Sequence, residues 1–261
     1  DHPAGSFSPN GFTVTALQAA YAAVVQTPVP GDVPARHLQD ALVAAVRIGD
    51  DTDTVAAIAG MLLGARWGAS AVPFAWRRLL HGWPGLRAAD LLRLAVLTAT
   101  RGVPTDNGWP SAPVLAGSGD PGFLVPLPGD DGVLLGNLDA LSEAVTQVDA
   151  VVSLCRVGSE QVPEGLEHHQ VWLVDEPGAA ANPNLRFVLD DTADAIQTLR
   201  DEGKRVFVHC VGGASRTPTV AAAYLARLDG TSGREALERV AAAVPFHNPH
   251  NTSFLAALGA R

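Results

Sequence analysis

The residues best suited to chemistry in this sequence are Cys210 and Arg216, which stand six positions apart. Residues 206–208 are apolar and predict the end of a buried strand, and the apolar run at 218–225 predicts a helix. The residues between these elements are therefore expected to form a strand-to-helix turn. Backbone N–H groups in such a turn, together with the dipole of the following helix, favour a bound anion.

Cys210 lies at the start of this turn, where the same N–H groups stabilise a thiolate, and a thiolate is a nucleophile. Arg216 can bind the same anion with two N–H groups of its guanidinium. Gly212 and Gly213 allow the backbone to come close to a ligand. The turn is thus predicted to combine a nucleophile with an oxyanion site.

The pattern His-Cys-x5-Arg-Thr at 209–217 resembles the signature of the cysteine-dependent protein tyrosine phosphatases, and its surroundings are most similar to their dual-specificity branch. The resemblance covers residues 130–261. It implies a C-terminal α/β domain with a largely parallel central sheet, a phosphocysteine intermediate and no cofactor. The residues that it implies for phosphate binding are Val211, Gly212, Gly213, Ala214, Ser215 and Arg216. The competing interpretations are a buried structural cysteine and a catalytically inactive relative.

A phosphatase also needs a proton donor, since expelling an unprotonated alkoxide is costly. Asp175 follows the apolar stretch 171–174 and begins a loop of Pro, Gly and Ala, which is where the family carries its general acid. Glu176 is the rival carboxylate. The alternative is that both carboxylates only face solvent or cap a backbone segment.

Roles are also predicted for five other side chains. Thr217 is expected to donate its hydroxyl to the nucleophilic sulfur, unless it is only a helix-start threonine, and His209 is expected to order the turn by hydrogen bonding. Cys155 is expected to be buried and inert, with the alternative that it is a resolving thiol on oxidation. His168 and His169 are predicted to lie in a loop, where two adjacent histidines make a weak metal site.

Strand and helix patterns alternate in the C-terminal half, which predicts an α/β fold. The strands are expected at 133–138, 150–155, 171–174 and 205–208, and the helices at 139–147, 185–202, 218–227 and 234–244. Residues 106–132 are rich in Gly, Pro, Ser and Asp and are expected to be mostly linker and loop. The predicted domains are therefore 1–105 and 106–261.

Residues 1–105 carry apolar residues at helical spacing and predict an all-α segment. Residues 50–60 are similar to the C-terminal metal motif of the ADP-ribosylglycohydrolase family. That resemblance implies Asp51, Asp53 and Thr54 as oxygen ligands of Mg²⁺, for which such ligands are suitable. The alternative is that they cap a helix N-terminus. The family's other ligand set is missing from this sequence, so only half a metal site is expected. Either a second chain or a missing N-terminal segment completes the domain, or the domain is a remnant that serves as a scaffold.

The composition and the net charge also limit the possible partners and the cellular compartment. A hydrophobic content of 47% is enough for two cores, and no apolar run reaches the roughly 18 residues of a membrane span. The net charge is −9 and Lys204 is the only lysine, which argues against nucleic acid and anionic membranes as partners. Two cysteines suit a reducing compartment. The chain is expected to be cytoplasmic, and its excess of Ala and Arg indicates a bacterial source.

The expected activity is hydrolysis of phosphomonoesters in proteins. Phosphotyrosine is the first expectation, because residues 211–215 lack the lysines that would favour polyphosphorylated lipids or nucleotides. One alternative is a magnesium-dependent ADP-ribosyl hydrolase with an accessory phosphatase domain. The other is a non-catalytic module that captures a phosphorylated or ADP-ribosylated partner.

Overall fold

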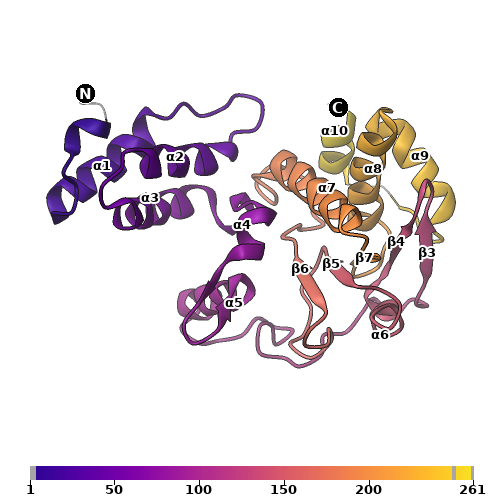
Figure 1. Ribbon diagram of the computed structural model, residues 1–261. Helices are drawn as coiled ribbons and strands as arrows, with labels where there is room; N and C mark the ends of the chain where they lie inside the picture. Colours follow the sequence, from indigo (N-terminus) through magenta and orange to yellow (C-terminus); the bar gives the residue numbers. More distant parts are fainter. Residues whose placement is uncertain (1–3, 249–250, 260–261) are drawn as a thin grey trace. The chain divides into compact units, whose positions relative to one another are not determined.

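The structure is a computed structural model that describes residues 4–248 and 251–259. The chain divides into two compact units, Asp1–Trp76 and Arg77–Arg261, which are drawn in Figure 1. Within the described residues, no helix is both long enough and apolar enough to cross a membrane.

The first unit is built from helices packed through small residues. Its elements are η1 (Ala4–Phe7), α1 (Thr13–Gln26), α2 (Arg36–Arg47), α3 (Thr52–Trp67) and η2 (Ala69–Ala71), and α4 (Phe74–Leu79) begins in it. The alanines at the helix contacts are buried: Ala19, Ala20, Ala41, Ala45 and Ala59. Side chains this short let neighbouring helices approach closely. The helical character predicted for this part is confirmed.

The second unit begins with a short irregular region. Two-residue strands β1 (His81–Gly82) and β2 (Leu86–Arg87) pair in antiparallel fashion ahead of α5 (Ala88–Ala99). The helical segment predicted for residues 1–105 also contains this short ladder, which the sequence did not reveal. Two strands of two residues are too short to show an alternating pattern, and the turn between them depends on Gly85, whose φ is +122°.

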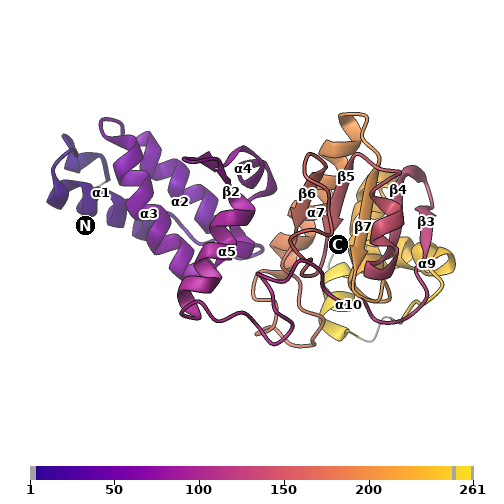
Figure 2. The same ribbon diagram turned by 90° about the horizontal axis from the view of Figure 1, so that it is seen from below.

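The second unit is organised around a five-stranded sheet. Its strands are β3 (Leu124–Leu127), β4 (Asp130–Asn137), β5 (Ala150–Ser153), β6 (Glu167–Gln170) and β7 (Val206–Cys210). The order across the sheet is β3-β4-β7-β5-β6, which can be followed in Figure 2. Only the β3–β4 pairing is antiparallel, so the predicted α/β fold with a largely parallel central sheet is confirmed.

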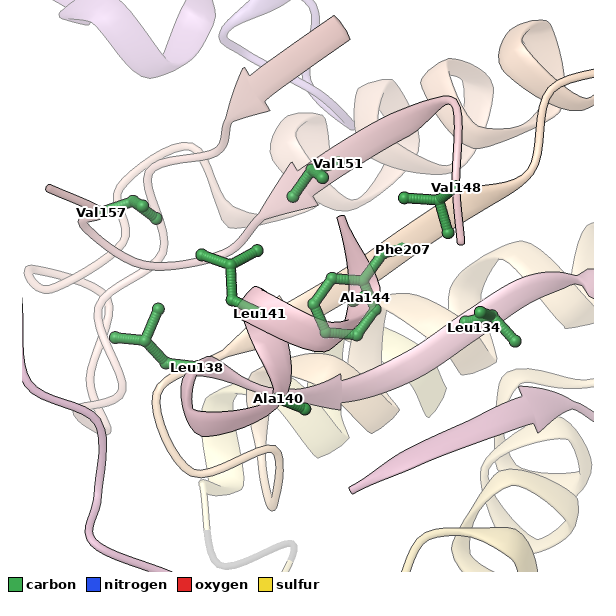
Figure 3. Close-up of a cluster of buried hydrophobic side chains, with 9 residues drawn as sticks. All are labelled: Leu134, Leu138, Ala140, Leu141, Ala144, Val148, Val151, Val157 and Phe207. Carbon is green, nitrogen blue, oxygen red and sulfur yellow. The ribbon is translucent and has the colours of Figure 1, made fainter. Parts of the chain in front are cut away.

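Helices cover both faces of this sheet. Figure 1 shows α7 (Leu185–Asp201), α8 (Arg216–Asp229), α9 (Gly233–Ala243) and α10 (Thr252–Gly259) on one side and α6 (Leu141–Ala144) on the other. The α6 side holds a core of nine buried residues, in which Leu141 and Val151 pack near the ring of Phe207 (Figure 3). Every residue of β7 is buried, because this central strand is covered on both faces.

Three sequence predictions differ from the structure in this unit. The helix expected at 139–147 is only η3 (Leu138–Ala140) followed by α6. The strand expected at 171–174 lies beyond the end of β6, and its apolar pattern reflects the burial of Val171 and Leu173 outside the ladder. His168 and His169 belong to β6 and not to a loop. This edge strand is half-buried along its length, so its sequence Glu-His-His-Gln lacks the alternation that would reveal it.

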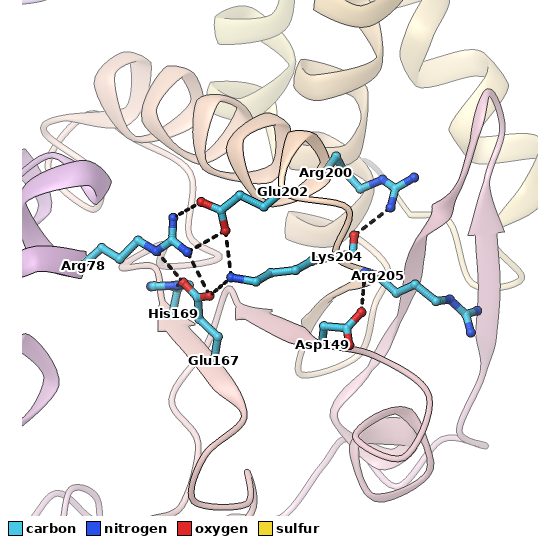
Figure 4. A network of polar contacts seen from close by, with 8 residues as sticks. All are labelled: Arg78, Asp149, Glu167, His169, Arg200, Glu202, Lys204 and Arg205. Atoms are coloured by element: carbon cyan, nitrogen blue, oxygen red, sulfur yellow. Dashed lines mark hydrogen bonds and ion pairs between the residues drawn. The ribbon is translucent and has the colours of Figure 1, made fainter.

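A network of charges joins the end of α4 to the sheet (Figure 4). Arg78 and Lys204 both bind the carboxylates of Glu167 and Glu202, with Arg78 Nε 2.8 Å from Glu167 Oε1 and Lys204 Nζ 2.8 Å from Glu202 Oε2. His169 Nε2 lies 2.7 Å from Glu167 Oε1. The hydrogen bond from His169, together with the hydrogen bond from Lys204 and the charge of Arg78, lowers the pKa of the Glu167 carboxyl to about 2. The network therefore ties the start of the second unit to β6 and to the α7–β7 connection.

Candidate active site

The candidate site lies where the central strand ends. β7 finishes at Cys210, residues 211–215 form a loop, and α8 begins at Arg216. The Cys210 side chain is almost completely buried, with 1% of the residue exposed. The backbone N–H of Gly213 donates to Cys210 Sγ over 3.2 Å, so the loop curls its backbone toward the sulfur. This is the strand–loop–helix arrangement that the sequence predicted.

The tight course of the loop depends on Gly213. Its φ is +73°, and a methyl group placed on it would lie 2.5 Å from the ring of Phe123 and 3.0 Å from the carbonyl oxygen of Gly136. A side chain is therefore excluded both by the backbone conformation and by space. Gly212 is different, because a methyl group there would meet only Ser118, at 3.9 Å. The steric need for glycine in this loop is at Gly213 alone.

Arg216 is held by one nitrogen, and another makes no hydrogen bond. Its Nη1 donates to the carbonyl oxygens of Leu154, over 2.9 Å, and Leu173, over 3.2 Å, in the segments that follow β5 and β6. Its Nε is buried and has no hydrogen-bond acceptor among the residues that the structure describes. A buried unpaired N–H costs free energy, so this edge of the guanidinium is suited to an anionic ligand.

Asp175 joins this group, as the sequence predicted. Its Oδ1 accepts a hydrogen bond from Ser215 Oγ at 2.8 Å, and its Oδ2 lies 3.7 Å from Arg216 Nε. The Asp175 side chain is partly accessible, whereas the rival Glu176 is an exposed residue. The structure therefore brings the nucleophile loop, the arginine and the first-choice acid together at the carboxyl end of the sheet.

Asn251 is a part of the site that sequence reasoning missed. Its Nδ2 donates to Asp175 Oδ1 over 3.3 Å, while its Oδ1 accepts from the backbone N–H groups of Ser253 and Phe254 at the start of α10. The Gly178 N–H donates to Ser253 Oγ over 2.8 Å, which attaches the Asp175 loop to the same helix. An Asn directly before Thr252, the first residue of α10, was a capping signal that could have drawn attention to it.

The predicted linker also contributes to the site. Residues 106–123 have no regular secondary structure, yet Trp109 and Leu115 are buried. Ser118 faces Gly212, and its N–H and Oγ both contact Asp139 Oδ2, at 3.1 and 3.2 Å. The apolar residues scattered through this Gly- and Pro-rich stretch were the signal that it packs against a domain.

The remaining predicted side chains lie close to the loop. His209 is fully buried, and burial lowers its pKa to about 4. Thr217 Oγ1 donates to the Gly136 carbonyl oxygen over 3.3 Å, so its donation to the sulfur stays a prediction. Cys155 is buried as expected, and burial raises the pKa of its thiol to about 12. Its alternative role as a resolving thiol also stays a prediction.

The predicted magnesium residues lie at the start of α3. The Asp51 N–H donates to Asn10 Oδ1 over 2.8 Å, and the Asp51 side chain makes no cap hydrogen bond. A hydrogen bond with Asp51 and backbone N–H groups of the first turn lower the pKa of Asp53. Within the described part of the chain, no three His, Cys, Asp or Glu residues are grouped closely enough to hold a metal ion. The predicted set of Asp51, Asp53 and Thr54 contains only two residues of these four types, so the Mg²⁺ site stays a prediction.

Comparison with known proteins matches both halves of the chain. Residues 2–105 match the family model for ADP-ribosylglycohydrolase, and residues 135–259 match that for the dual specificity phosphatase catalytic domain. Both resemblances predicted from the sequence are therefore confirmed.

Individual relatives match the C-terminal part. The chain is 30% identical over 133 residues to dual specificity protein phosphatase 1 of Arabidopsis thaliana, covering 48% of this chain and 63% of that protein. It is 32% identical over 93 residues to dual specificity protein phosphatase 5 of Rattus norvegicus, covering 36% and 23%. The crystal structure of human DUSP28 shares 26% identity and a TM-score of 0.46, covering 53% of this chain and 92% of that one.

Proposed function

We propose that this chain, whose residues 135–259 match the dual specificity phosphatase catalytic domain, hydrolyses phosphomonoesters through Cys210. The observation that carries the proposal is the convergence of three groups at the end of β7. The Cys210 sulfur accepts a loop N–H, Ser215 of the same loop donates to Asp175, and Asp175 forms an ion pair with Arg216. Nucleophile, oxyanion site and proton donor are the parts that such a reaction needs.

The proposed reaction has two steps. In the first, Cys210 Sγ bonds to phosphorus while the bond from phosphorus to the leaving oxygen breaks, and Asp175 gives that oxygen a proton. In the second, water attacks the phosphocysteine, Asp175 takes the proton from water, and phosphate and the thiolate are released. The loop N–H groups and Arg216 hold the three phosphoryl oxygens throughout. Thr217 is proposed to assist the departing sulfur.

The proposed substrates are phosphoproteins, with phosphotyrosine first. The loop at 211–215 has no basic side chain that would attract a polyphosphorylated lipid or nucleotide. A cytoplasmic location in a bacterium is proposed from composition alone.

The helical unit supports the alternative function, magnesium-dependent ADP-ribosyl hydrolysis. Large apolar side chains on α1, including Leu17 and Tyr21, are more than half exposed, while its alanines face the other helices. A helix that is apolar all round is normally buried. We propose that another polypeptide segment completes this unit and that magnesium-dependent ADP-ribosyl hydrolysis would then need ligands from that segment.

One assay distinguishes these functions. The intact chain is expected to hydrolyse para-nitrophenyl phosphate in EDTA. In a separate reaction without EDTA, vanadate, which mimics a pentacoordinate phosphoryl group, is expected to stop this turnover. No turnover under these conditions would contradict the phosphatase proposal. Release of ADP-ribose from an ADP-ribosylated protein only when MgCl₂ is added would favour the alternative. If neither reaction occurs, the non-catalytic binding module is favoured.

Replacing Asp175 by asparagine is expected to lower kcat on an aryl phosphate by about 100-fold, because the leaving oxygen loses its proton donor. Asparagine keeps a side-chain oxygen for the hydrogen bond from Ser215, so the loop should stay in place. The effect should be smaller on a substrate whose leaving group is already a weak base. Glu176→Gln is the matched control, and a larger loss there than at Asp175 would transfer the acid role to Glu176.

A further inference from the structure

A line of hydrogen-bonding groups crosses three neighbouring strands and ends at the nucleophile's own backbone. His168 Nε2 on β6 lies 2.9 Å from Ser153 Oγ on β5, and the same Oγ lies 2.7 Å from His209 Nε2 on β7. The other nitrogen of that ring, His209 Nδ1, lies 3.3 Å from the carbonyl oxygen of Cys210. The reaction described above makes no use of His168 or Ser153.

The sheet register explains why these side chains meet. Ser153 and His209 are direct partners in the β5–β7 ladder, so their side chains stand side by side on one face. His168 pairs with Val151, which is two residues before Ser153 and therefore on the same face as it. Ser153 and His209 are fully buried, so water does not compete for these contacts.

The donor and acceptor properties of these groups allow the hydrogen bonds to run in only one direction, from His168 to the Cys210 carbonyl oxygen. A carbonyl oxygen can only accept, so the contact with Cys210 requires the proton on His209 Nδ1. A neutral ring then has a lone pair on Nε2, which must accept from the Ser153 hydroxyl. That hydroxyl has no second proton, so its oxygen must accept from His168 Nε2–H. All four groups are satisfied only in this order.

The surroundings keep both rings neutral. Burial is the main cause that lowers the pKa of His209 to about 4, and the charge of Arg216 acts in the same direction. Burial likewise lowers the pKa of His168 to about 3, with further contributions from His209, His169 and Arg93. The Cys155 sulfur lies 4.0 Å from His209 Nδ1 and is a weak partner beside the carbonyl oxygen.

We propose that Ser153 and His168 are positioning residues that hold the ring of His209 through its Nε2, and that His209, in its Nδ1–H tautomer, thereby fixes the Cys210 carbonyl at the start of the phosphate loop. The inference rests on the proposed phosphatase activity for its effect on rate, but not for its effect on the ring. Without the Ser153 hydroxyl, the Cys210 carbonyl oxygen still accepts from Nδ1–H, but Nε2 has lost its donor and the ring is held at one nitrogen only. The ring is then free to tilt, and the loop that carries the nucleophile would shift.

The tautomer can be read directly. In protein labelled with ¹⁵N-histidine, two-bond nitrogen–proton correlations are expected to show the wild-type His209 ring protonated on Nδ1 and unprotonated on Nε2. Ser153→Ala is expected to keep the Nδ1 proton and to shift the ¹⁵N resonance of Nε2, which loses its hydrogen-bond donor. An Nε2–H tautomer in the wild type, or an unchanged Nε2 resonance in Ser153→Ala, would overturn the proposal. This measurement needs no turnover, so a failure of the phosphatase proposal would be seen separately.

Activity provides the second test. Ser153→Ala and His168→Leu are each expected to lower kcat/KM on para-nitrophenyl phosphate by about 10- to 100-fold, as expected when a reacting group is misplaced by a fraction of an ångström. His168→Gln should restore much of the loss, because its amide nitrogen can donate from the position of Nε2. The exposed Ser159→Ala is the control. Equal kcat/KM for His168→Leu and His168→Gln, with both variants folded, would contradict the role of His168.

Discussion

Replacing Cys210 by serine is expected to lower aryl phosphate turnover by about 10⁵-fold or more, because the step that forms the covalent intermediate loses its nucleophile. The fold should be retained, since a serine fits the space of the buried cysteine and its oxygen can still accept the Gly213 N–H. The measurement is kcat on para-nitrophenyl phosphate, with the melting temperature as a check on folding. Binding of vanadate should be weakened much less than turnover.

Cys155 supplies the matched control for this experiment. It is the other cysteine of the chain, it is also buried, and the high pKa of its thiol keeps it protonated at neutral pH. Cys155→Ser should therefore keep most of the activity. Alkylation with iodoacetate, mapped by mass spectrometry, should modify Cys210 before Cys155. Equal loss of turnover in the two serine variants would show that the rate depends on packing and not on a nucleophile at Cys210.

Replacing Arg216 by lysine is expected to lower kcat/KM by about 10³-fold, since a planar two-point contact with the phosphoryl oxygens is lost in the transition state. A lysine keeps the positive charge but cannot bind the Leu154 and Leu173 carbonyl oxygens and an anion at the same time in the present geometry. The charge alone therefore does not replace the guanidinium. The measurement compares kcat/KM with the affinity for inorganic phosphate.

Arg227→Lys is the control for the arginine experiment. Arg227 is on the same helix, α8, and its exposed guanidinium pairs with Asp190 and Asp194 on α7. Exposed ion pairs contribute little to stability, so this variant should behave as the wild type. A comparable loss of kcat/KM in both variants would show that the helix and not the anion contact is responsible.

The sequence was sufficient where the signal was local. The loop between Cys210 and Arg216 combines an apolar strand, small residues and a helix start within a short stretch, so its conformation could be predicted with the nucleophile in it. Asp175 was found because it follows the apolar stretch 171–174 and begins a loop of Pro, Gly and Ala, where the resembled family carries its general acid. The parallel sheet followed from the alternation of strands and helices.

The sequence was insufficient where a role depends on distant segments. Asn251 reaches Asp175 from 76 positions away, and Ser118 reaches the phosphate loop from the predicted linker. His168 was placed in a loop because an edge strand with two half-buried faces has no periodic apolar pattern. The role of such a residue comes from a contact that only the folded chain creates, and the local sequence does not predict that contact.

The contacts of Arg77 and Trp109, near the start of the second unit, affect where the chain should be cut when fragments of the protein are made. Arg77 donates to the Gln170 carbonyl oxygen over 3.0 Å and pairs with Asp191, and Trp109 is buried in an edge-on contact with Trp172. Arg77 and Trp109 lie ahead of residue 135, where the match to the phosphatase family begins. A fragment cut at that match would uncover the Trp172 ring, the Gln170 carbonyl oxygen and the Asp191 carboxylate. The natural place to divide the chain is the boundary of packing at Arg77, and not the boundary of sequence similarity.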